Sequence, residues 1–568
     1  MFAIQKTVCT TYGMKRFISN IILLISICLV VFSCAKMGTL SGGLKDTKPP
    51  VIVKCKPENG STNFDEESFT LYFDEYIKLN KINEKLLISP PIEEQPEVIL
   101  KGKKVEVKID LTQLQANTTY NFNFSDAIAD NNENNPISGF VYAFSTGHVI
   151  DSLSVKGKIL DAHLFTPIEG AYVSLYKNET DSLFKTVRPD YLGRTDKNGM
   201  FEIPYIADNA YSIYALKDEN YNYVFDQATE AIAFLNYRIK PRIIFDTVTN
   251  GDSIKINRRT IPDSLELLMF TEDHLPQYIT KTERKTPHFC QVVFSRPHVS
   301  KPIIIIEREI NKNIKFSQDY DTVSIWFAND SLYLRDSIEM IFRYVEPLYP
   351  DTIRTDTIFA ILDANSKIKP GLELIKPKEK EITKPYTIRL NHPVLKIDKQ
   401  LLTITYAHDT TEIELKANIN VSKDSLSIFI DSDFLLGEKY DIKIREGFIT
   451  DIFNFKNLSD SVYVYIKSED DYGHLKLYIP EFENKKAYVE LLQKEKVIYI
   501  EKLESSYADF TYIKPETYKI RLVRDLNNNM KWDPGKFSSK LQAEPVFYHP
   551  DEIEIRNNWQ HELTWTIH

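Results

Sequence analysis

The sequence predicts an all-β protein built from several β-sandwiches in tandem, and three observations support this prediction. Among the 568 residues, Tyr and Phe each occur 32 times but Gly only 18 times, a composition that favours strands. Apolar residues alternate with polar ones in short runs, as in Phe69, Leu71 and Phe73, and such alternation is typical of half-buried strands. Pro, Asn and Gly separate the runs, so each stretch of about 100 residues holds several short strands, which indicates a sandwich.

A secretory signal peptide is predicted over residues 1–33, with Met14 as an alternative start. The basic pair Lys15-Arg16 precedes an apolar run over 21–32, and a small residue, Ser33, follows it. The apolar run is shorter than the ~20 residues that a membrane-spanning helix needs. The chain that remains after cleavage is long enough for about four or five domains.

The end of the apolar run, Val31-Phe32-Ser33-Cys34, resembles a bacterial lipobox, in which the cysteine becomes the lipidated first residue. This resemblance implies acyl chains on Cys34, palmitate among them, and two or more chains give stable membrane anchoring. Phe32 departs from the smaller residue usual at its position. A plainly cleaved signal and an uncleaved anchor helix are the alternatives. Residues 34–48 contain several Gly and polar residues and are expected to form a flexible tether.

Charge and cysteine usage argue against several classes of protein. The net charge of −10 is spread without blocks, which argues against nucleic acid or an anionic membrane surface as a partner. After Cys34 the sequence holds two more cysteines, Cys55 and Cys290, which lie far apart and lack the spacing of a metal site. We therefore expect hydrophobic cores, rather than a disulfide between these two, to hold the fold.

The first module, predicted over 49–147, carries several recognisable motifs. These are Pro49-Pro50, Pro57-Glu58-Asn59-Gly60, Phe73-Asp74-Glu75, Asn117-Thr118-Thr119-Tyr120 and Phe144-Ser145-Thr146-Gly147. In these motifs the module resembles a bacterial Ig-like domain of the type found in S-layer and surface proteins. The preceding Ser41-Gly42-Gly43-Leu44-Lys45-Asp46-Thr47 resembles the tether of Ig-like-domain lipoproteins of the Bacteroidetes. The resemblance implies an immunoglobulin-like sandwich on a lipid anchor.

The second module, predicted over 153–237, is repeated at the end of the chain. It opens with a strand, continues with a turn and a second strand, and contains the hairpin signal Asn198-Gly199. This order resembles the transthyretin-like or Cna-B-type sandwich, which implies an accessory module without catalytic residues. Ala171-Tyr172-Val173 is matched by Ala487-Tyr488-Val489, and Tyr211 precedes Asp218 by the same seven positions that separate Tyr518 from Asp525. Two coincidences with shared spacing predict a second copy, the fifth module, over 471–568.

Two further sandwiches are predicted between these copies. The third module, over 262–365, shows alternation at Val323, Ile325 and Phe327. The fourth module, over 370–468, repeats features of the first: Leu436–Tyr440 and Ile449–Asp451 correspond to Leu114–Tyr120 and Ile128–Asp130. Both stretches are therefore interpreted as Ig-like sandwiches, although the third shows no such repeat.

Two acidic loops in the repeated module are the candidate metal sites. Each reads D-x-N-x-N-x3-D, with the oxygen-bearing residues Asp218, Asn220, Asn222 and Asp226 in one copy and Asp525, Asn527, Asn529 and Asp533 in the other. Alternate positions of a tight loop can direct side-chain oxygens to one point, as Ca²⁺ requires. The pattern resembles the first half of an EF-hand loop and calcium loops of Cna-B-type domains. It lacks the glycine at the sixth position, where Tyr223 and Met530 stand, and the glutamate at the twelfth, so Glu230 or carbonyl groups would have to contribute. The alternative is a polar loop whose Asx side chains bond their own backbone.

Other residues give no sign of catalysis. The sequence has no G-x-S-x-G, Walker, HExxH or dinucleotide-binding motif, and His288, Cys290 and His298 lack the partners of a zinc site. We therefore expect no enzyme and no cofactor other than calcium.

The predicted function is that of a structural or interaction scaffold, a lipoprotein of the cell envelope and a subunit of an outer-membrane assembly. Its partners would be the membrane, through Cys34, and other envelope proteins, with the leaflet face left open. The alternative is a surface glycan-binding lipoprotein that binds sugars through exposed aromatic side chains. The candidates are Trp326, Trp532, Trp559 and Trp565. The ordinary role of each of these tryptophans would be packing in a core.

Overall fold

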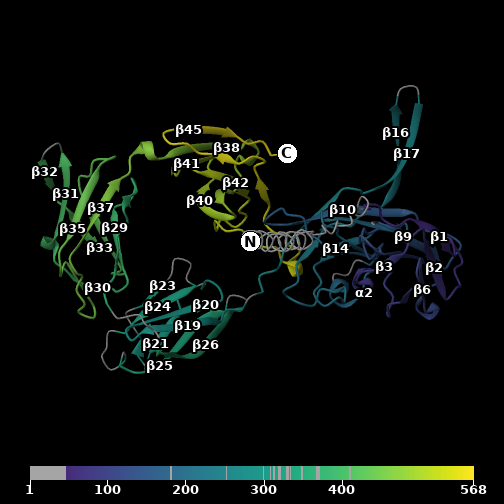
Figure 1. Cartoon of the computed structure of the whole chain (residues 1–568), viewed down its shortest axis with the longest axis horizontal. Coiled ribbons are helices and arrows are strands. Elements are labelled where there is room, and N and C mark those ends of the chain that lie inside the picture. Colours follow the sequence, from purple (N-terminus) through teal and green to yellow (C-terminus); the bar gives the residue numbers. More distant parts are fainter. Residues whose placement is uncertain are drawn as a thin grey trace, which may run out of the picture. The chain divides into compact units, whose positions relative to one another are not determined.

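The computed structural model describes residues 46–567 apart from 138, 179–181, 251–252, 275, 299, 307–308, 311–313, 317–320, 328–331, 333, 347–348, 366–370 and 409–410 (Figure 1). The predicted signal peptide, Cys34 and most of the tether lie outside these residues. The chain falls into two compact units. One runs to Leu87 and over Ile92–Ile150, and the other holds Ile88–Pro91 and everything from Asp151.

The predicted all-β fold is confirmed, because strands make up most of the regular structure. The α-helices that the structure describes, α2 (Ile82–Lys85) and α3 (Leu183–Thr186), are single turns. Short 3-10 turns connect other strands, at η1 (Leu111–Gln113), η2 (Lys399–Leu401), η3 (Glu469–Asp471), η4 (Pro480–Phe482) and η5 (Phe537–Ser539). Within the described part of the chain, no helix has the length and apolar character needed to cross a membrane.

The first module is a sandwich whose sheets enclose stacked aromatic rings. One sheet has the order β1 (Ile52–Lys56), β2 (Ser68–Phe73), β6 (Lys104–Lys108), β5 (Glu97–Leu100). A second sheet is β4 (Leu87–Ser89), β7 (Thr119–Asn123), β9 (Val141–Ser145), and β3 (Ile77–Leu79) pairs with β8 (Ile128–Asp130). Phe69 of β2 is fully buried, and its ring stacks on that of Tyr142 on β9, with the ring centroids 3.9 Å apart. The alternating residues of β2 therefore face the core, as their pattern indicates.

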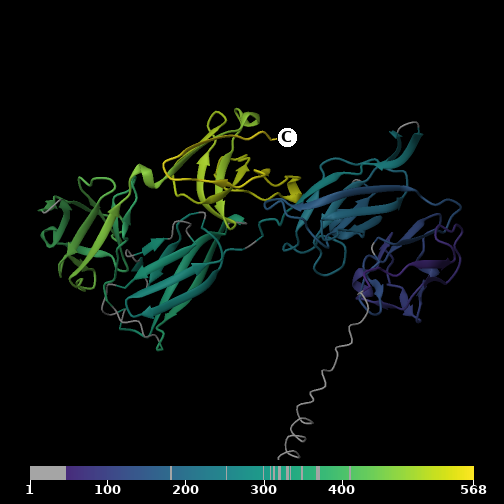
Figure 2. The same cartoon turned by 45° about the horizontal axis from the view of Figure 1, so that its top comes forward.

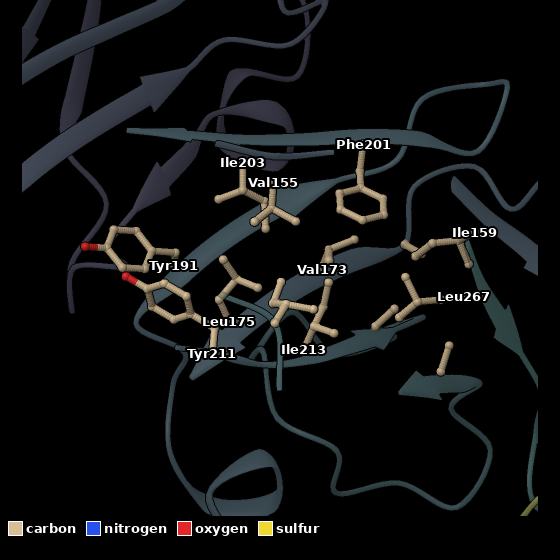
Figure 3. Close-up of a cluster of buried hydrophobic side chains, with 14 of the residues drawn as sticks. Val155, Ile159, Val173, Leu175, Tyr191, Phe201, Ile203, Tyr211, Ile213 and Leu267 are labelled. Carbon is tan, nitrogen blue, oxygen red and sulfur yellow. The ribbon is translucent and has the colours of Figure 1, made fainter. Parts of the chain in front are cut away.

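The second module contains two sheets around one apolar core. The first sheet has the order β13 (Met200–Ile206), β10 (Leu153–Asp161), β18 (Leu265–Met269). The second has the order β12 (Tyr191–Arg194), β11 (Tyr172–Tyr176), β14 (Ser212–Leu216), β15 (Ile232–Phe234). Figure 3 shows Val155 and Phe201 of the first sheet gathered with Val173, Ile213 and Leu267 in this core.

The second module extends further along the chain than the sequence indicated. β18 lies within the stretch assigned to the third module, but it pairs in parallel with β10, with Gly157 opposite Leu265. These residues therefore complete the sheet of the second module. The sequence did not indicate that β18 belongs to the second module, because a long hairpin separates β15 from β18. The hairpin consists of β16 (Arg242–Asn250) and β17 (Ser253–Ile261).

The third and fourth modules are also built from paired sheets. In the third the orders are β19 (Ile279–Thr286), β20 (Phe289–Phe294), β24 (Thr322–Trp326), β23 (Ile314–Phe316) and β22 (Glu309–Ile310), β21 (Ile303–Ile306), β25 (Ser337–Glu346), β26 (Tyr349–Ile361). In the fourth module the first sheet has the order β27 (Leu374–Ile375), β29 (Tyr386–Leu390), β34 (Ser427–Asp431), β33 (Asn418–Val421). The second has the order β28 (Glu379–Lys380), β37 (Asp460–Ile466), β35 (Lys439–Ile444), β31 (Leu402–His408), β32 (Thr411–Leu415). In addition, β30 (Val394–Ile397) pairs with β36 (Ile449–Asp451).

The fourth module repeats a hydrogen bond of the first. The Gln115 N–H donates to the hydroxyl of Tyr120 at 2.8 Å, and the Leu435 N–H donates to the hydroxyl of Tyr440 at 2.8 Å. In both cases the tyrosine is buried and the donor lies five residues earlier. The repeat seen in the sequence therefore corresponds to the same local structure.

The fifth module has the strand order of the second. Its sheets are β41 (Tyr507–Ile513), β38 (Gly473–Tyr478), β45 (Gln560–Thr564) and β40 (Lys496–Lys502), β39 (Tyr488–Gln493), β42 (Thr517–Val523), β43 (Val546–Tyr548), with β44 (Ile553–Glu554) also on β42. The last strand of the three-stranded sheet is parallel to its neighbour in both modules. The hydroxyls of Tyr211 and Tyr518 each donate to the carbonyl four residues earlier, at 2.7 and 3.0 Å.

Candidate functional site

The first acidic loop joins β14 to β15 and is held by its own polar side chains. The Asp218 carboxylate, 8% exposed, accepts hydrogen bonds at 2.7–3.1 Å from three backbone N–H groups of the loop, those of Asn220, Tyr221 and Tyr223. The side-chain amides of Asn220 and Asn222 donate to Asp226 at 3.1 and 2.6 Å. The structure thus brings the four predicted ligand residues of this copy into one hydrogen-bonded loop.

The second acidic loop has the same arrangement. The Asp525 carboxylate accepts the backbone N–H groups of Asn529 and Met530 at 3.0 and 2.9 Å. The amides of Asn527 and Asn529 donate to Asp533 at 2.6 and 2.8 Å. The shared spacing of the two sequences therefore produces shared geometry.

A buried glutamate lies beneath each loop. Glu230 accepts the backbone N–H groups of Glu219 and Asp226, both at 3.3 Å. Glu544 accepts those of Leu526 and Asp533, at 2.7 and 3.2 Å, from the corresponding positions of its own loop. Burial raises the pKa of both glutamates, while the backbone N–H groups oppose that shift. Glu544 escaped the sequence analysis because it lies much further along the chain from its loop than Glu230 does.

Calcium binding by these loops stays a prediction. Among the described residues, no three His, Cys, Asp or Glu side chains are grouped as a metal ion would require. The amide nitrogens of Asn220 and Asn222 face Asp226, whereas Ca²⁺ takes oxygen ligands at about 2.3–2.6 Å. A bound ion would therefore require these amides to turn their oxygens toward it. Without an ion, the loops are self-bonded Asx loops, the alternative that the sequence left open.

The tryptophans lie mostly in packed positions. Trp326 points away from its own core, yet it is 4% exposed, and its indole N–H donates to the carbonyl of Asn391 in the fourth module at 3.0 Å. Trp565 belongs to the core of the fifth module. Trp532 is half-buried and stacks on His163, with ring centroids 4.5 Å apart. Trp559 is 51% exposed.

The histidines and the cysteine singled out in the third module also pack among other side chains. Cys290 is fully buried, and burial raises the pKa of its thiol to about 12. His298 is 7% exposed, and burial lowers its pKa to about 4. The ring of His288 lies 4.4 Å from that of Phe453 in the fourth module. Cys55 and Cys290 are both free thiols.

The β16–β17 hairpin is a surface feature that the sequence analysis missed. It forms a sheet of two strands, paired from Arg242–Ile261 at the base to Asn250–Ser253 near the tip. Figures 1 and 2 show this ribbon extending beyond the sheets of the second module. Phe245 on β16 is 67% exposed, and Arg258 lies opposite it. The signal was present as two runs of β-branched residues around Asn250-Gly251-Asp252-Ser253.

Comparison with protein families identifies the first module. Residues 46–146 match the family model described as a bacterial Ig-like domain. This match supports the Ig-like domain that the motifs of the first module predicted. Comparison with curated proteins gives no match.

Several solved structures match the chain with low sequence identity and low TM-scores. BcpA, the major pilin subunit of Bacillus cereus, is 10% identical over 73% of this chain and 98% of its own, with a TM-score of 0.14. Domains 1–6 of the surface layer protein SbsC are 10% identical over 90% of this chain and 68% of their own, with a TM-score of 0.13. The Bacillus anthracis TIE protein is 10% identical over 93% and 75%, with a TM-score of 0.13. TM-scores this low support no conclusion about function.

Proposed function

We propose that the chain is a non-catalytic lipoprotein of the cell envelope that acts as a structural or interaction scaffold, a subunit of an outer-membrane assembly. The lipobox-like ending at Cys34 supports the anchor, and the bacterial Ig-like domain directly after the tether supports a role in the envelope. Repeated sandwiches suit binding and spacing better than catalysis, because their sheets offer edges and faces rather than a deep pocket.

The β16–β17 hairpin is the observation that carries the interaction role. A two-stranded hairpin is at best marginally stable alone in water, and both of its outer edges carry unpaired backbone groups. Such edges accept a strand from another protein. With Phe245 exposed beside these edges, the hairpin is the part of the second module best placed to bind an envelope protein by strand addition.

Affinity purification from gently solubilised membranes, followed by mass spectrometry, tests this proposal. The intact chain should retain a stoichiometric outer-membrane partner at moderate salt. Phe245→Asp should lose that partner, whereas Tyr463→Asp, which changes a 72% exposed aromatic residue on the fourth module, should keep it. Recovery of the intact chain alone would refute the stable-subunit role.

The lipid anchor is tested separately. Cys34→Ala should move the protein from the membrane fraction to the soluble fraction, and intact-mass analysis should show the loss of the acyl chains. A variant that stays in the membrane with unchanged mass would contradict lipidation at Cys34.

The glycan-binding alternative depends mainly on Trp559, the most exposed of the four tryptophans. Arg556 lies over its ring at 5.3 Å and the ring centroid of His561 lies 5.6 Å from that of the indole, yet 51% of Trp559 stays exposed to a sugar. Trp559→Ala should abolish binding to surface polysaccharide under this alternative, and unchanged binding would exclude this residue.

A further inference from the structure

The second sheet of the second module is buried on both faces. In β14, Ile213 and Ala215 enter the core, while Tyr214 and Leu216 point to the opposite face, where they are 4% and 1% exposed. A sheet with two apolar faces needs a second covering layer. Phe184 of α3 and Phe225 supply part of it, and Phe537 and Ala543 of the fifth module add to it.

Phe537 of the fifth module fills an aromatic pocket on this outer face. It lies on η5 and is 3% exposed. Its ring centroid is 5.4 Å from Phe184, 5.7 Å from Tyr214, 6.2 Å from Phe225 and 5.5 Å from Phe234. All four rings meet it edge-on, which is a favourable arrangement for aromatic pairs.

Two lysines add cation–π contacts to the same pocket. The Lys540 ammonium lies 4.6 Å from the Phe537 ring centroid and 5.2 Å from that of Tyr214. From the second module, the Lys185 ammonium lies 5.5 Å from Phe537 and 5.6 Å from Phe225. Each cation thus contacts rings of both modules, and such contacts strengthen when they are shielded from water.

Polar contacts fix the loop that carries Phe537. The Phe537 N–H donates to the carboxylate of Glu272, and the Gln542 amide donates to the Phe234 carbonyl at 2.9 Å. Outside the loop, the Tyr548 hydroxyl on β43 adds a further contact between the two modules by donating to the His163 carbonyl at 3.0 Å. A Cβ added to Gly535 would lie 2.3 Å from the ring of Phe270, so the approach is as close as a glycine permits.

The repeat shows that this loop is an addition peculiar to the fifth module. Asp226 and Glu230 in the second module correspond to Asp533 and Glu544 in the fifth, because each glutamate accepts the N–H of its aspartate. Three residues separate the first pair and ten the second, so the fifth module has seven extra residues here, and Phe537 and Lys540 lie in this loop.

The pocket, in turn, belongs to the second module. Counted from the corresponding Tyr211 and Tyr518, the fifth module has Arg521 where the second has Tyr214. Arg521 is paired with Glu490 at 2.5 Å, so a charged pair occupies the place of an aromatic wall. The loop and the pocket are therefore complementary and not interchangeable between the two copies.

We propose that residues 534–543 form an intramolecular clasp that fixes the fifth module onto the second, with Phe537 as the anchoring residue. The aromatic pocket of the second module is thus a binding site for a phenylalanine-bearing loop, and its partner is the fifth module of the same chain. The clasp joins two modules that the third and fourth separate in sequence. It does not depend on the lipid anchor or on an envelope partner.

Distance measurement between spin labels in the full chain tests the clasp. Labels at Lys197→Cys and Lys502→Cys, both exposed positions, report the two modules in a Cys55→Ser background. The otherwise unchanged chain should give one narrow distance distribution. Phe537→Ala should broaden it, and so should Tyr214→Arg, which places the residue of the fifth module in the pocket. Ser538→Ala, an exposed neighbour on the same turn, should leave it narrow.

Hydrogen exchange in β10 and β38 shows whether both sandwiches stay folded in these variants. Lys540→Glu tests the same contact without removing a ring, and should also broaden the distribution. A narrow distribution in folded Phe537→Ala and Lys540→Glu, or a broad one in the unchanged chain, would overturn the proposal.

Discussion

At the scale of single residues, the buried ion pair of the fifth module has the largest expected effect on stability. Arg521 and Glu490 have side chains 4% and 8% exposed, with Nε and Oε2 2.5 Å apart, and Arg521 also donates to the Tyr548 hydroxyl at 3.1 Å. Removing one partner leaves the other charge buried and unpaired, which costs about 3–5 kcal/mol. Glu490→Gln should therefore lower the free energy of unfolding by roughly this amount in urea titrations. The double variant Glu490→Leu/Arg521→Met should recover most of it, and failure to recover would point to packing rather than charge.

His298 should make the stability of the third module depend on pH. Both ring nitrogens are buried without a hydrogen-bond partner, and burial lowers the pKa to about 4, against about 6.5 in an unfolded chain. Between these values the unfolded state binds the proton and the folded state does not, so stability falls as pH falls from about 6.5 to 4. The slope from one such group approaches about 1.4 kcal/mol per pH unit. His298→Phe should flatten the slope in unfolding curves measured over this range, and an unchanged slope would contradict the assignment.

The two acidic loops give a paired test for calcium. Titration calorimetry of the full chain should show binding that weakens in Asp226→Asn and in Asp533→Asn, because each aspartate supplies one of the two charged groups in its loop. Asp196→Asn, a carboxylate in a different Asx turn, is the control. If no heat of binding is measured at millimolar calcium, the calcium prediction is wrong and the loops are held only by their own hydrogen bonds.

The sequence predicts which residues of the second and fifth modules correspond wherever the two copies keep the same spacing. Tyr211 thus corresponds to Tyr518, and Asp218 to Asp525. The correspondence could not be predicted for Glu230 and Glu544, because the extra residues in the fifth module change the spacing. The hydrogen bonds, and not the sequence, show that these glutamates are equivalent.

At the scale of elements, the parallel pairing of β10 with β18 depends on a glycine. A Cβ at Gly157 would lie 2.4 Å from the Leu265 carbonyl and 2.8 Å from the Phe201 ring. Gly157→Ala should destabilise the second module by about 1–3 kcal/mol, the usual cost of overpacking. Gly371→Ala, where an added Cβ meets nothing within 4 Å, should be nearly neutral in the same thermal unfolding experiment. Equal effects of the two variants would contradict the close approach.

Strands with clean alternation were easier to predict from sequence than strands covered on both sides. Phe69 and Leu71 face the core as their period of two indicates. By contrast, β14 is apolar along nearly its whole length, which indicates a covering layer but not its identity. Likewise β18 could not be assigned to the second module, because the alternation of Leu265, Leu267 and Met269 does not show which strand it pairs with across a long hairpin.

At the scale of the whole molecule, we expect the cores rather than a disulfide to hold the fold. Cys55 and Cys290 are free thiols, one in each compact unit. The thermal unfolding midpoint of the mature chain should therefore be the same with and without dithiothreitol. A lower midpoint after reduction, or a faster band in non-reducing electrophoresis, would contradict this.

The all-β class and the internal repeat could be predicted from composition, alternation and spacing. The contact between the second and fifth modules could not, because it depends on which side chains meet across about 300 residues of chain. Periodicity describes one element at a time and carries no information about such distant pairs.

That separation has a consequence for the order in which the protein matures. Because the sequence predicts an exported chain, its modules are expected to fold after translocation, in the order in which they emerge, so the second module precedes the fifth. Until Phe537 arrives, Phe184, Tyr214, Phe225 and Phe234 lack the ring that covers them.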